Sequence, residues 1–126
     1  MKALKNLVER RLWNRLELRL PARLVAPGGE SISAVALDLS QNGVNLAVGA
    51  PRVGETPLVR FLEREEMHHL VEIHLFPCPE ETWRLKGLVM WFNHDHRLPE
   101  MPYSLGIEFC EPAPLPPNWR RLCRRY

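Results

Sequence analysis

Short segments in which apolar and polar residues alternate follow one another along most of this chain of 126 residues. In residues 16–20 leucine occupies every second position, with Glu17 and Arg19 between, which is the two-residue period of a half-buried β-strand. Pro21 is expected to end this strand or to place it at an edge of its sheet. Similar segments predict further strands over residues 31–39, 44–48, 58–62, 69–76, 84–92 and 103–109.

The residues between these segments are those that form turns. Pro27, Gly28 and Gly29 separate the first two strands, and residues 38–43 and 50–54 are rich in turn-forming residues in the same way. No helical segment of about 10–15 residues lies between strands, which excludes alternating βαβ units. Six or seven short strands joined by turns predict an all-β fold, either an antiparallel barrel or a sandwich, and the length is that of one domain.

The two ends of the chain differ from this pattern. In residues 1–14, aliphatic residues recur at roughly helical spacing among Lys and Arg. This predicts a short amphipathic helix or a flexible arm ahead of a domain over residues 15–126. Near the other end, the prolines of residues 112–117 predict a stiff connector. Residues 118–126 then predict a short C-terminal helix, with Trp119 and Leu122 as its apolar contacts.

Charge is unevenly distributed along the chain. The formal net charge is only +2, but residues 1–25 carry +5 and residues 117–126 carry +4, which leaves the remainder at −7. An acidic body with two basic ends is unlike a uniformly basic nucleic-acid-binding protein, so no nucleic acid is expected as the main partner. The C-terminal arginines suit either contact with nucleic acid or an acidic partner, or the negative end of a terminal helix.

Several absences narrow the class further. No apolar run approaches the ~18–20 residues that cross a bilayer, and residues 1–7 lack the long apolar stretch of a signal peptide. Cys78, Cys110 and Cys123 are odd in number and form no C-x-x-C pair, so a disulfide framework is not expected. The expectation is a cytoplasmic protein with reduced thiols and no membrane span.

Neither metal binding nor catalysis has a recognisable signature. The histidines include His68-His69 and His94-x-His96, but none lies in a zinc-finger spacing or an H-E-x-x-H motif. A G-x-S-x-G nucleophile turn and a phosphate-binding glycine loop are also missing. The sequence therefore predicts a non-enzymatic protein without a metal or a cofactor.

Two short patterns carry more information together than either does alone. Arg11 and Arg15 form R-x-x-x-R at the junction between the arm and the first strand. Asp38, Ser40 and Gly43 form D-x-S-x-x-G at the bend between two predicted strands. Taken singly, an arginine pair is common, and an Asp-x-Ser turn often does no more than cap its own backbone.

In this combination and order, on a barrel-like strand pattern, the chain resembles the PilZ domain family of bacterial cyclic di-GMP receptors. Residues 86–91, KGLVMW, are similar to the family's late strand that ends in an aromatic residue. Residues 105–109, LGIEF, are similar to its closing Gly-Ile-x-Phe strand. The resemblance extends from about Arg10 to Phe109, and it implies a six-stranded antiparallel β-barrel with a short C-terminal helix.

The resemblance also implies a cyclic di-GMP site on these motifs. The residues that it places in this site are those of both patterns: Arg11, Arg15, Asp38, Ser40 and Gly43. Arg10 matches an adjoining arginine that is associated with two stacked ligand molecules, so two molecules per chain are expected. Trp91 is expected either to pack its ring against a base of the ligand or to serve the core or the rim of the barrel.

The residue types suit this ligand, which carries two phosphates and two guanines. A guanidinium group matches the adjacent O6 and N7 acceptors of guanine, stacks on a purine face and neutralises a phosphate. An ionised Asp38 accepts hydrogen bonds from guanine N–H groups, and Ser40 offers a hydroxyl donor. Gly43 is expected to take a positive φ that brings the backbone close to the ligand.

Three functions follow from this reading. The first is a cyclic di-GMP receptor and adaptor that changes the conformation of its N-terminal arm on binding and signals to a partner protein. The second is a PilZ-shaped adaptor barrel that acts through protein contacts without significant nucleotide binding. The third, an oligonucleotide-binding barrel, ranks last because the sequence lacks a dense aromatic and basic face.

Overall fold

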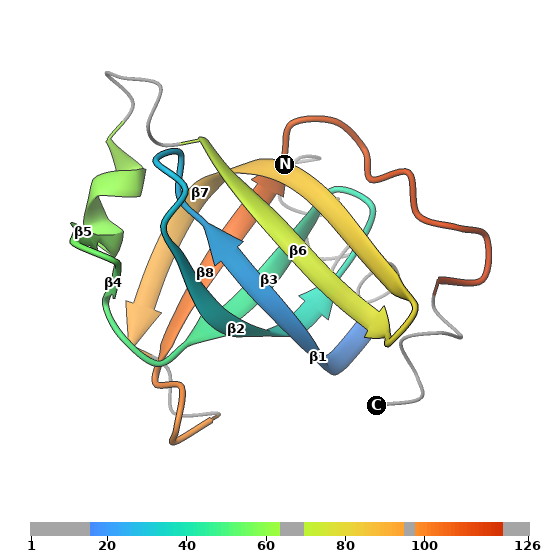
Figure 1. The fold of residues 1–126 in the computed structure, drawn as a ribbon, viewed down its shortest axis with the longest axis horizontal. Helices are drawn as coiled ribbons and strands as arrows, with labels where there is room; N and C mark the ends of the chain where they lie inside the picture. Colours follow the sequence, from blue (N-terminus) through green and yellow to red (C-terminus); the bar gives the residue numbers. More distant parts are fainter. Residues whose placement is uncertain (1–15, 64–69, 95–97, 120–126) are drawn as a thin grey trace, which may run out of the picture.

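The computed structural model describes residues 16–63, 70–94 and 98–119, which contain six strands closed into an antiparallel barrel (Figure 1). The strands of the barrel are β1 (Leu16–Val25), β2 (Ser31–Leu39), β3 (Gly43–Val48), β6 (Leu70–Cys78), β7 (Glu81–His94) and β8 (Tyr103–Phe109). Their order around the barrel is β1-β2-β3-β8-β7-β6. The predicted all-β fold with a six-stranded antiparallel barrel is therefore confirmed.

One predicted strand, over residues 58–62, is wrong. This segment forms a 3₁₀ helix, η1 (Leu58–Leu62), which follows a small two-stranded sheet of β4 (Arg52–Val53) and β5 (Thr56–Pro57). The side chains that η1 buries are Leu58 and Phe61, three residues apart, which is the period of a 3₁₀ turn and not that of a strand. The aliphatic Val59 between them is exposed, so apolar content alone suggested a strand here.

Pro21 does not end the first strand, because β1 continues through it to Val25. On one side β1 pairs with β2 over most of its length, and Pro21 lies opposite Val35. On the other side β6 pairs with β1 only from Ala22 to Val25. The proline thus lies beyond the end of the β1–β6 pairing, where its missing N–H removes no hydrogen bond to β6.

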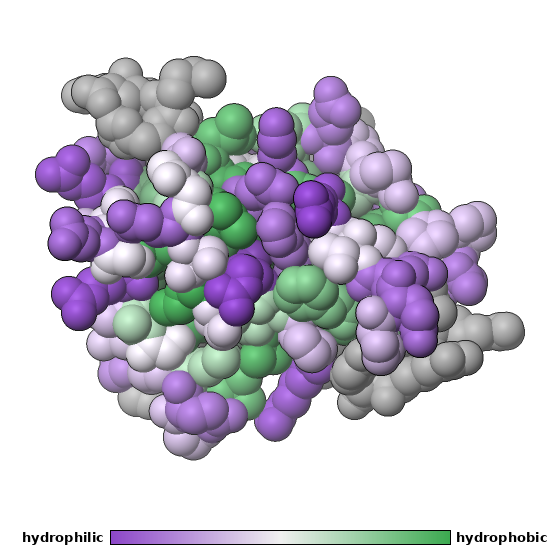
Figure 2. Space-filling view, in the orientation of Figure 1, coloured by the Kyte–Doolittle hydropathy of each residue, from purple (hydrophilic) through white to green (hydrophobic). Residues whose placement is uncertain are grey.

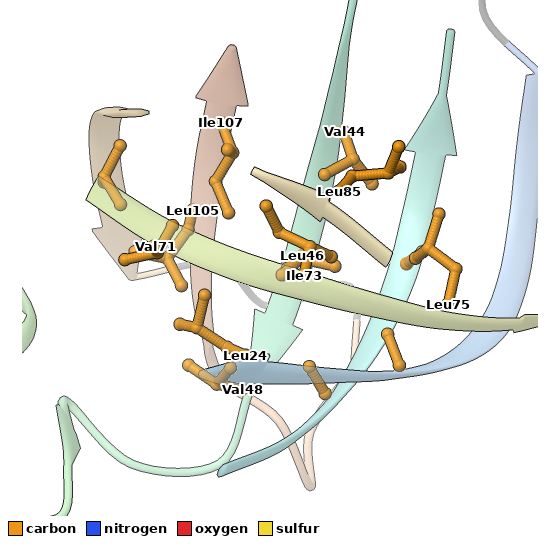
Figure 3. Packing of buried hydrophobic residues seen from close by; sticks show 14 of the residues in the cluster. Leu24, Val44, Leu46, Val48, Val71, Ile73, Leu75, Leu85, Leu105 and Ile107 are labelled. Atoms are coloured by element: carbon orange, nitrogen blue, oxygen red, sulfur yellow. The ribbon is translucent and has the colours of Figure 1, made fainter. Parts of the chain in front are cut away.

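The core fills the interior of the barrel. Leucine, isoleucine and valine side chains from all six strands point inward and meet there (Figure 3). Every second side chain of a strand points into the barrel. β6 shows this most clearly, because its residues alternate strictly between buried and half-buried. Leu58 and Phe61 of η1 join the same cluster, and so does the predicted contact Trp119. The remainder of the predicted C-terminal helix, including Leu122, and the predicted arm over residues 1–14 lie outside the described residues.

The outer face of β1, β6 and β7 is largely polar. Figure 2 shows this face as mostly hydrophilic with scattered apolar side chains. Arg23 of β1 donates hydrogen bonds to Ser31 and Ser33 of β2, at 2.9 and 3.3 Å. His74 of β6 is bonded to Glu72 on the same strand, at 2.9 Å. The polar residues of the alternating pattern therefore cover the barrel on this side.

A β-bulge in β2 places two consecutive side chains on the outside of the barrel. Ala36 lies opposite Leu46 of β3 and Asp38 lies opposite Asn45, so Leu37 is an extra residue on β2. Ala36 and Leu39 are both buried in the core, and the two side chains between them face outward.

A second bulge lies in β7. Val89 and Trp91 pair with the consecutive residues Ile107 and Gly106 of β8, which leaves Met90 as the extra residue. Met90 and Trp91 are exposed, at 47% and 37% respectively. The two bulges bring Asp38 and Trp91 to the outer surface.

Candidate functional site

The candidate site is a row of four residues that crosses four neighbouring strands on the outer face of the barrel. The register places Asp38 of β2 opposite Asn45 of β3, Asn45 opposite Gly106 of β8, and Gly106 opposite Trp91 of β7. Two residues expected from the sequence, Asp38 and Trp91, therefore lie in one cross-strand row although they are far apart in the chain. Asn45 and Gly106 complete this row.

Asp38 and Asn45 are joined by a side-chain hydrogen bond. The Nδ2 group of Asn45 donates to Oδ2 of Asp38 at 3.3 Å. Asp38 is half-buried, whereas Asn45 is only 5% exposed. The carboxylate is thus positioned by a buried amide at the outer surface of the barrel, where part of Asp38 is exposed.

Asn45 is one of the two residues of this row, with Gly106, that were not expected in the site from the sequence. Its Oδ1 atom is buried and has no hydrogen-bond partner among the described residues, a situation that costs about 1–3 kcal/mol of folding free energy. One signal was present in the sequence: an asparagine interrupts the otherwise apolar run of β3, all of whose residues are buried. Such an exception to a buried apolar pattern often marks a functional position.

The indole ring of Trp91 lies directly over Gly106. A Cβ atom at Gly106 would overlap Nε1 and Cε2 of Trp91. The indole ring can therefore occupy this position only because Gly106 has no side chain. Trp91 lies on the outer face and is 37% exposed, outside the barrel core. The core role considered for Trp91 is therefore wrong, whereas contact with a base and a role at the rim of the barrel stay predictions; part of the indole is exposed at the surface.

Ser40 organises the turn between β2 and β3. Its hydroxyl accepts a hydrogen bond from the backbone N–H of Asn42 at 3.2 Å and donates to the carbonyl of Gly43 at 3.4 Å. The backbone N–H of Ser40 donates to the same carbonyl at 3.0 Å. Ser40 is 7% exposed, so its hydroxyl serves the local turn, as Ser commonly does at such positions.

The expected reason for Gly43 is wrong. In the described part of the chain, positive φ angles occur only at Gly29 and Gly54. Gly43 is instead required by the close approach of β3 to β8, because a Cβ atom there would lie 2.5 Å from the carbonyl oxygen of Ile107. The glycine of D-x-S-x-x-G is therefore needed because a side chain at the start of β3 would not fit against β8.

The β2–β3 turn is also attached to the last residue of β8 and to the chain that follows it. The carbonyl of Asn42 accepts the N–H of Phe109 at 2.9 Å, and the carbonyl of Gln41 accepts the N–H of Ala113 at 2.7 Å. The turn is thereby held from two sides, and the position of Asp38 at the end of β2 is well supported. β1 enters the barrel at this same end, because Leu16 pairs with Leu39.

Arg10, Arg11 and Arg15 lie outside the described residues. In the ranges that the structure describes, no group of three or more His, Cys, Asp and Glu residues is arranged to hold a metal ion. The same ranges contain no helix that is long and apolar enough to span a membrane.

Comparisons with known proteins define the class of the fold. No family model matches the chain, and no curated protein matches it in sequence. Among solved structures, the PilZ domain of YcgR from Escherichia coli with c-di-GMP is 12% identical at a TM-score of 0.54, covering 88% of this chain and 83% of that one. Bacillus subtilis inhibitor of motility, MotI/DgrA, is 14% identical at a TM-score of 0.55, covering 89% of this chain and 47% of that chain.

A third similar structure is the Borreliella burgdorferi PlzA protein in complex with c-di-GMP. It is 13% identical at a TM-score of 0.56, and the match covers 98% of this chain and 52% of that chain. The chain thus spans about half the length of MotI and PlzA, and most of the YcgR domain. These matches show that the barrel has the PilZ-type fold.

Proposed function

We propose that this protein is a cytoplasmic, non-catalytic receptor for cyclic di-GMP. The observation that supports it best is the cross-strand row, in which the Asp38 carboxylate and the exposed Trp91 indole lie on one surface of a PilZ-type barrel. A carboxylate accepts guanine N–H groups, and an indole offers a stacking face for a base. Two of the structurally similar proteins, YcgR and PlzA, were solved with c-di-GMP.

The arginine motif supplies the positive charge that this ligand requires. The phosphates and the O6 and N7 acceptors of guanine match the guanidinium groups of Arg11 and Arg15. Arg10 adds a third guanidinium beside them, which is the basis for proposing two ligand molecules per chain. Ser40 and Gly43 are proposed to belong to the same site, where they also shape the turn that carries Asp38.

Titration calorimetry with cyclic di-GMP is the direct test. We expect saturable binding with two ligands per chain, and a higher melting temperature in a thermal shift assay. At a free ligand concentration of 100 Kd, binding to the native state alone adds about 2.7 kcal/mol of stability for one site. Cyclic di-AMP serves as the control nucleotide. An endpoint of one ligand per chain would refute only the role proposed for Arg10. The absence of both binding heat and a thermal shift would refute the receptor function.

The proposed signal is a change in the N-terminal arm. Residues 1–25 carry a net charge of +5, and few local acids are available to pair with their guanidinium groups. A dianionic nucleotide beside Asp38 would supply this charge, so Arg11 and Arg15 are expected to close over the ligand and order the arm. The ordered arm would present a partner protein with a surface that differs between the free and bound states.

Amide hydrogen exchange with and without saturating cyclic di-GMP tests this switch. We expect fast exchange over residues 1–14 in the free protein and strong protection around Arg10–Arg15 in the complex. The amides of residues 72–75 in β6 serve as the internal reference, because this segment is paired with β1 on one side and β7 on the other. Equal protection of the arm in the two states would rule out the switch while leaving binding unaffected.

One observation favours the adaptor alternative, in which the barrel binds partner proteins without significant nucleotide affinity. The Ser40 hydroxyl is already engaged within its own turn, as it would be if D-x-S-x-x-G were only a turn motif. The same calorimetric titration separates the two functions, since the adaptor alternative predicts no binding of cyclic di-GMP.

A further inference from the structure

The buried amide of Asn45 presents an acceptor that the fold itself does not use. Asn45 is 5% exposed, and its Oδ1 atom is buried with no hydrogen-bond partner in the part of the chain that the structure describes. Every residue of β3 is buried, and a leucine or valine at this position would satisfy the strand without an unpaired polar atom. The presence of a polar side chain here therefore calls for a role outside folding.

The orientation of the amide is determined by its neighbour. An ionised carboxylate accepts hydrogen bonds and donates none, so the amide group directs Nδ2 and not Oδ1 toward Asp38. The observed contact, Asn45 Nδ2 to Asp38 Oδ2 at 3.3 Å, agrees with this requirement. The Oδ1 atom is the other end of the same planar group, and Asn45 lies between Asp38 and Gly106 in the cross-strand row.

We propose that Asn45 is a specificity-determining residue of the nucleotide site, and that its Oδ1 atom accepts an N–H group of a guanine base beside the Asp38 carboxylate. This inference rests on the proposed function and adds a base-reading residue to it. Guanine carries two neighbouring donors, N1–H and the N2 amino group, on one edge. Adenine presents an acceptor, N1, beside its amino group. Two adjacent acceptors on the protein therefore match guanine and oppose adenine.

Access to the Oδ1 atom requires a neighbouring group to move when the ligand binds. Trp91 is the described neighbour with this freedom, because its exposed indole rests on Gly106, the next residue of the row, where no side chain holds it. A rotation of the ring away from Gly106 opens the row and places the indole where a base can stack on it. Base reading and base stacking are thereby coupled through one side chain.

The test is the variant Asn45→Leu, which is similar in size and removes both polar atoms. We expect the affinity for cyclic di-GMP to fall by about tenfold or more, and the preference over cyclic di-AMP to decrease with it. We also expect the melting temperature of the free protein to stay the same or rise, because the unpaired acceptor is gone. Asn93→Leu is the matched control, since Asn93 is an exposed residue of β7 that is bonded to its own backbone neighbour.

Each outcome of this experiment has a clear meaning. If the wild-type protein binds cyclic di-GMP and Asn45→Leu retains both its affinity and its preference for guanine, the role of Asn45 is refuted and the receptor function stands. If the wild-type protein binds neither nucleotide, both proposals fail. A lower melting temperature with unchanged nucleotide preference would assign Asn45 a structural role only. Asn45→Val provides a second apolar variant should the leucine not be accommodated in β3.

Discussion

Replacing Gly43 with alanine is expected to destabilise the barrel by about 2–3 kcal/mol, close to the upper end of what a single added methyl group costs in a packed site. The added Cβ would lie 2.5 Å from the carbonyl oxygen of Ile107, which is backbone and cannot turn away. β3 and β8 must therefore separate at the position where they begin to pair. Urea denaturation followed by circular dichroism measures the loss, which corresponds to a melting temperature lower by about 10 °C.

The chain provides a matched control for this substitution. Gly28 lies in the turn between β1 and β2, its φ is not positive, and a Cβ atom there would meet no atom within 4 Å. We expect Gly28→Ala to change the free energy of unfolding by less than about 0.5 kcal/mol. Equal stabilities for the two alanine variants would contradict the explanation of Gly43 as a close-approach glycine.

Removal of the Asp38 carboxylate is expected to have the largest effect on ligand binding among the described residues. Asp38→Ala should weaken the binding of cyclic di-GMP by about tenfold to a hundredfold, which corresponds to about 1–3 kcal/mol for a lost charged hydrogen-bond acceptor. The barrel should remain folded, because Asp38 lies on the outer face and contributes no apolar surface to the core. A small loss of stability is expected from Asn45, whose Nδ2 group loses its carboxylate partner.

Calorimetry and far-ultraviolet circular dichroism on the same sample separate these effects. Glu72→Ala is the control, because it removes one carboxylate and changes the net charge equally, but from β6, which carries no residue of the row. We expect Glu72→Ala to bind the nucleotide as the wild-type protein does. An unfolded Asp38→Ala variant would instead support a purely structural role for the D-x-S-x-x-G turn.

Much of the strand pattern could be predicted because it is local. The strands over residues 31–39 and 103–109 have the predicted bounds, since alternation of side chains between two faces of a strand is written directly in the sequence. The strand predicted over residues 58–62 was wrong because its local pattern was not specific. Four apolar residues around Arg60 carry no clear period, and only contact with the core decided that Leu58 and Phe61 would be buried together.

The candidate site was predicted less completely than the fold. D-x-S-x-x-G is a local motif, so Asp38 and Ser40 could be selected from the sequence, together with Gly43, for which the expected conformation was wrong. The adjacency of Asp38, Asn45 and Trp91 depends on the pairing of β2, β3, β8 and β7, which no short pattern contains. It depends further on the extra residues Leu37 and Met90, because a shift of one residue moves a side chain from one face of a strand to the other.

The sequence alone thus specifies the six long strands of the barrel, because the period of apolar residues and the chemistry of turns act over a few neighbouring positions. The tertiary structure decides which side chains share a surface. Asn45 shows the difference: in the sequence it is one polar residue within an apolar strand, and its unpaired acceptor becomes visible only after β3 is packed between β2 and β8. Burial and hydrogen-bond satisfaction are properties of neighbours in space, and the closed barrel determines those neighbours.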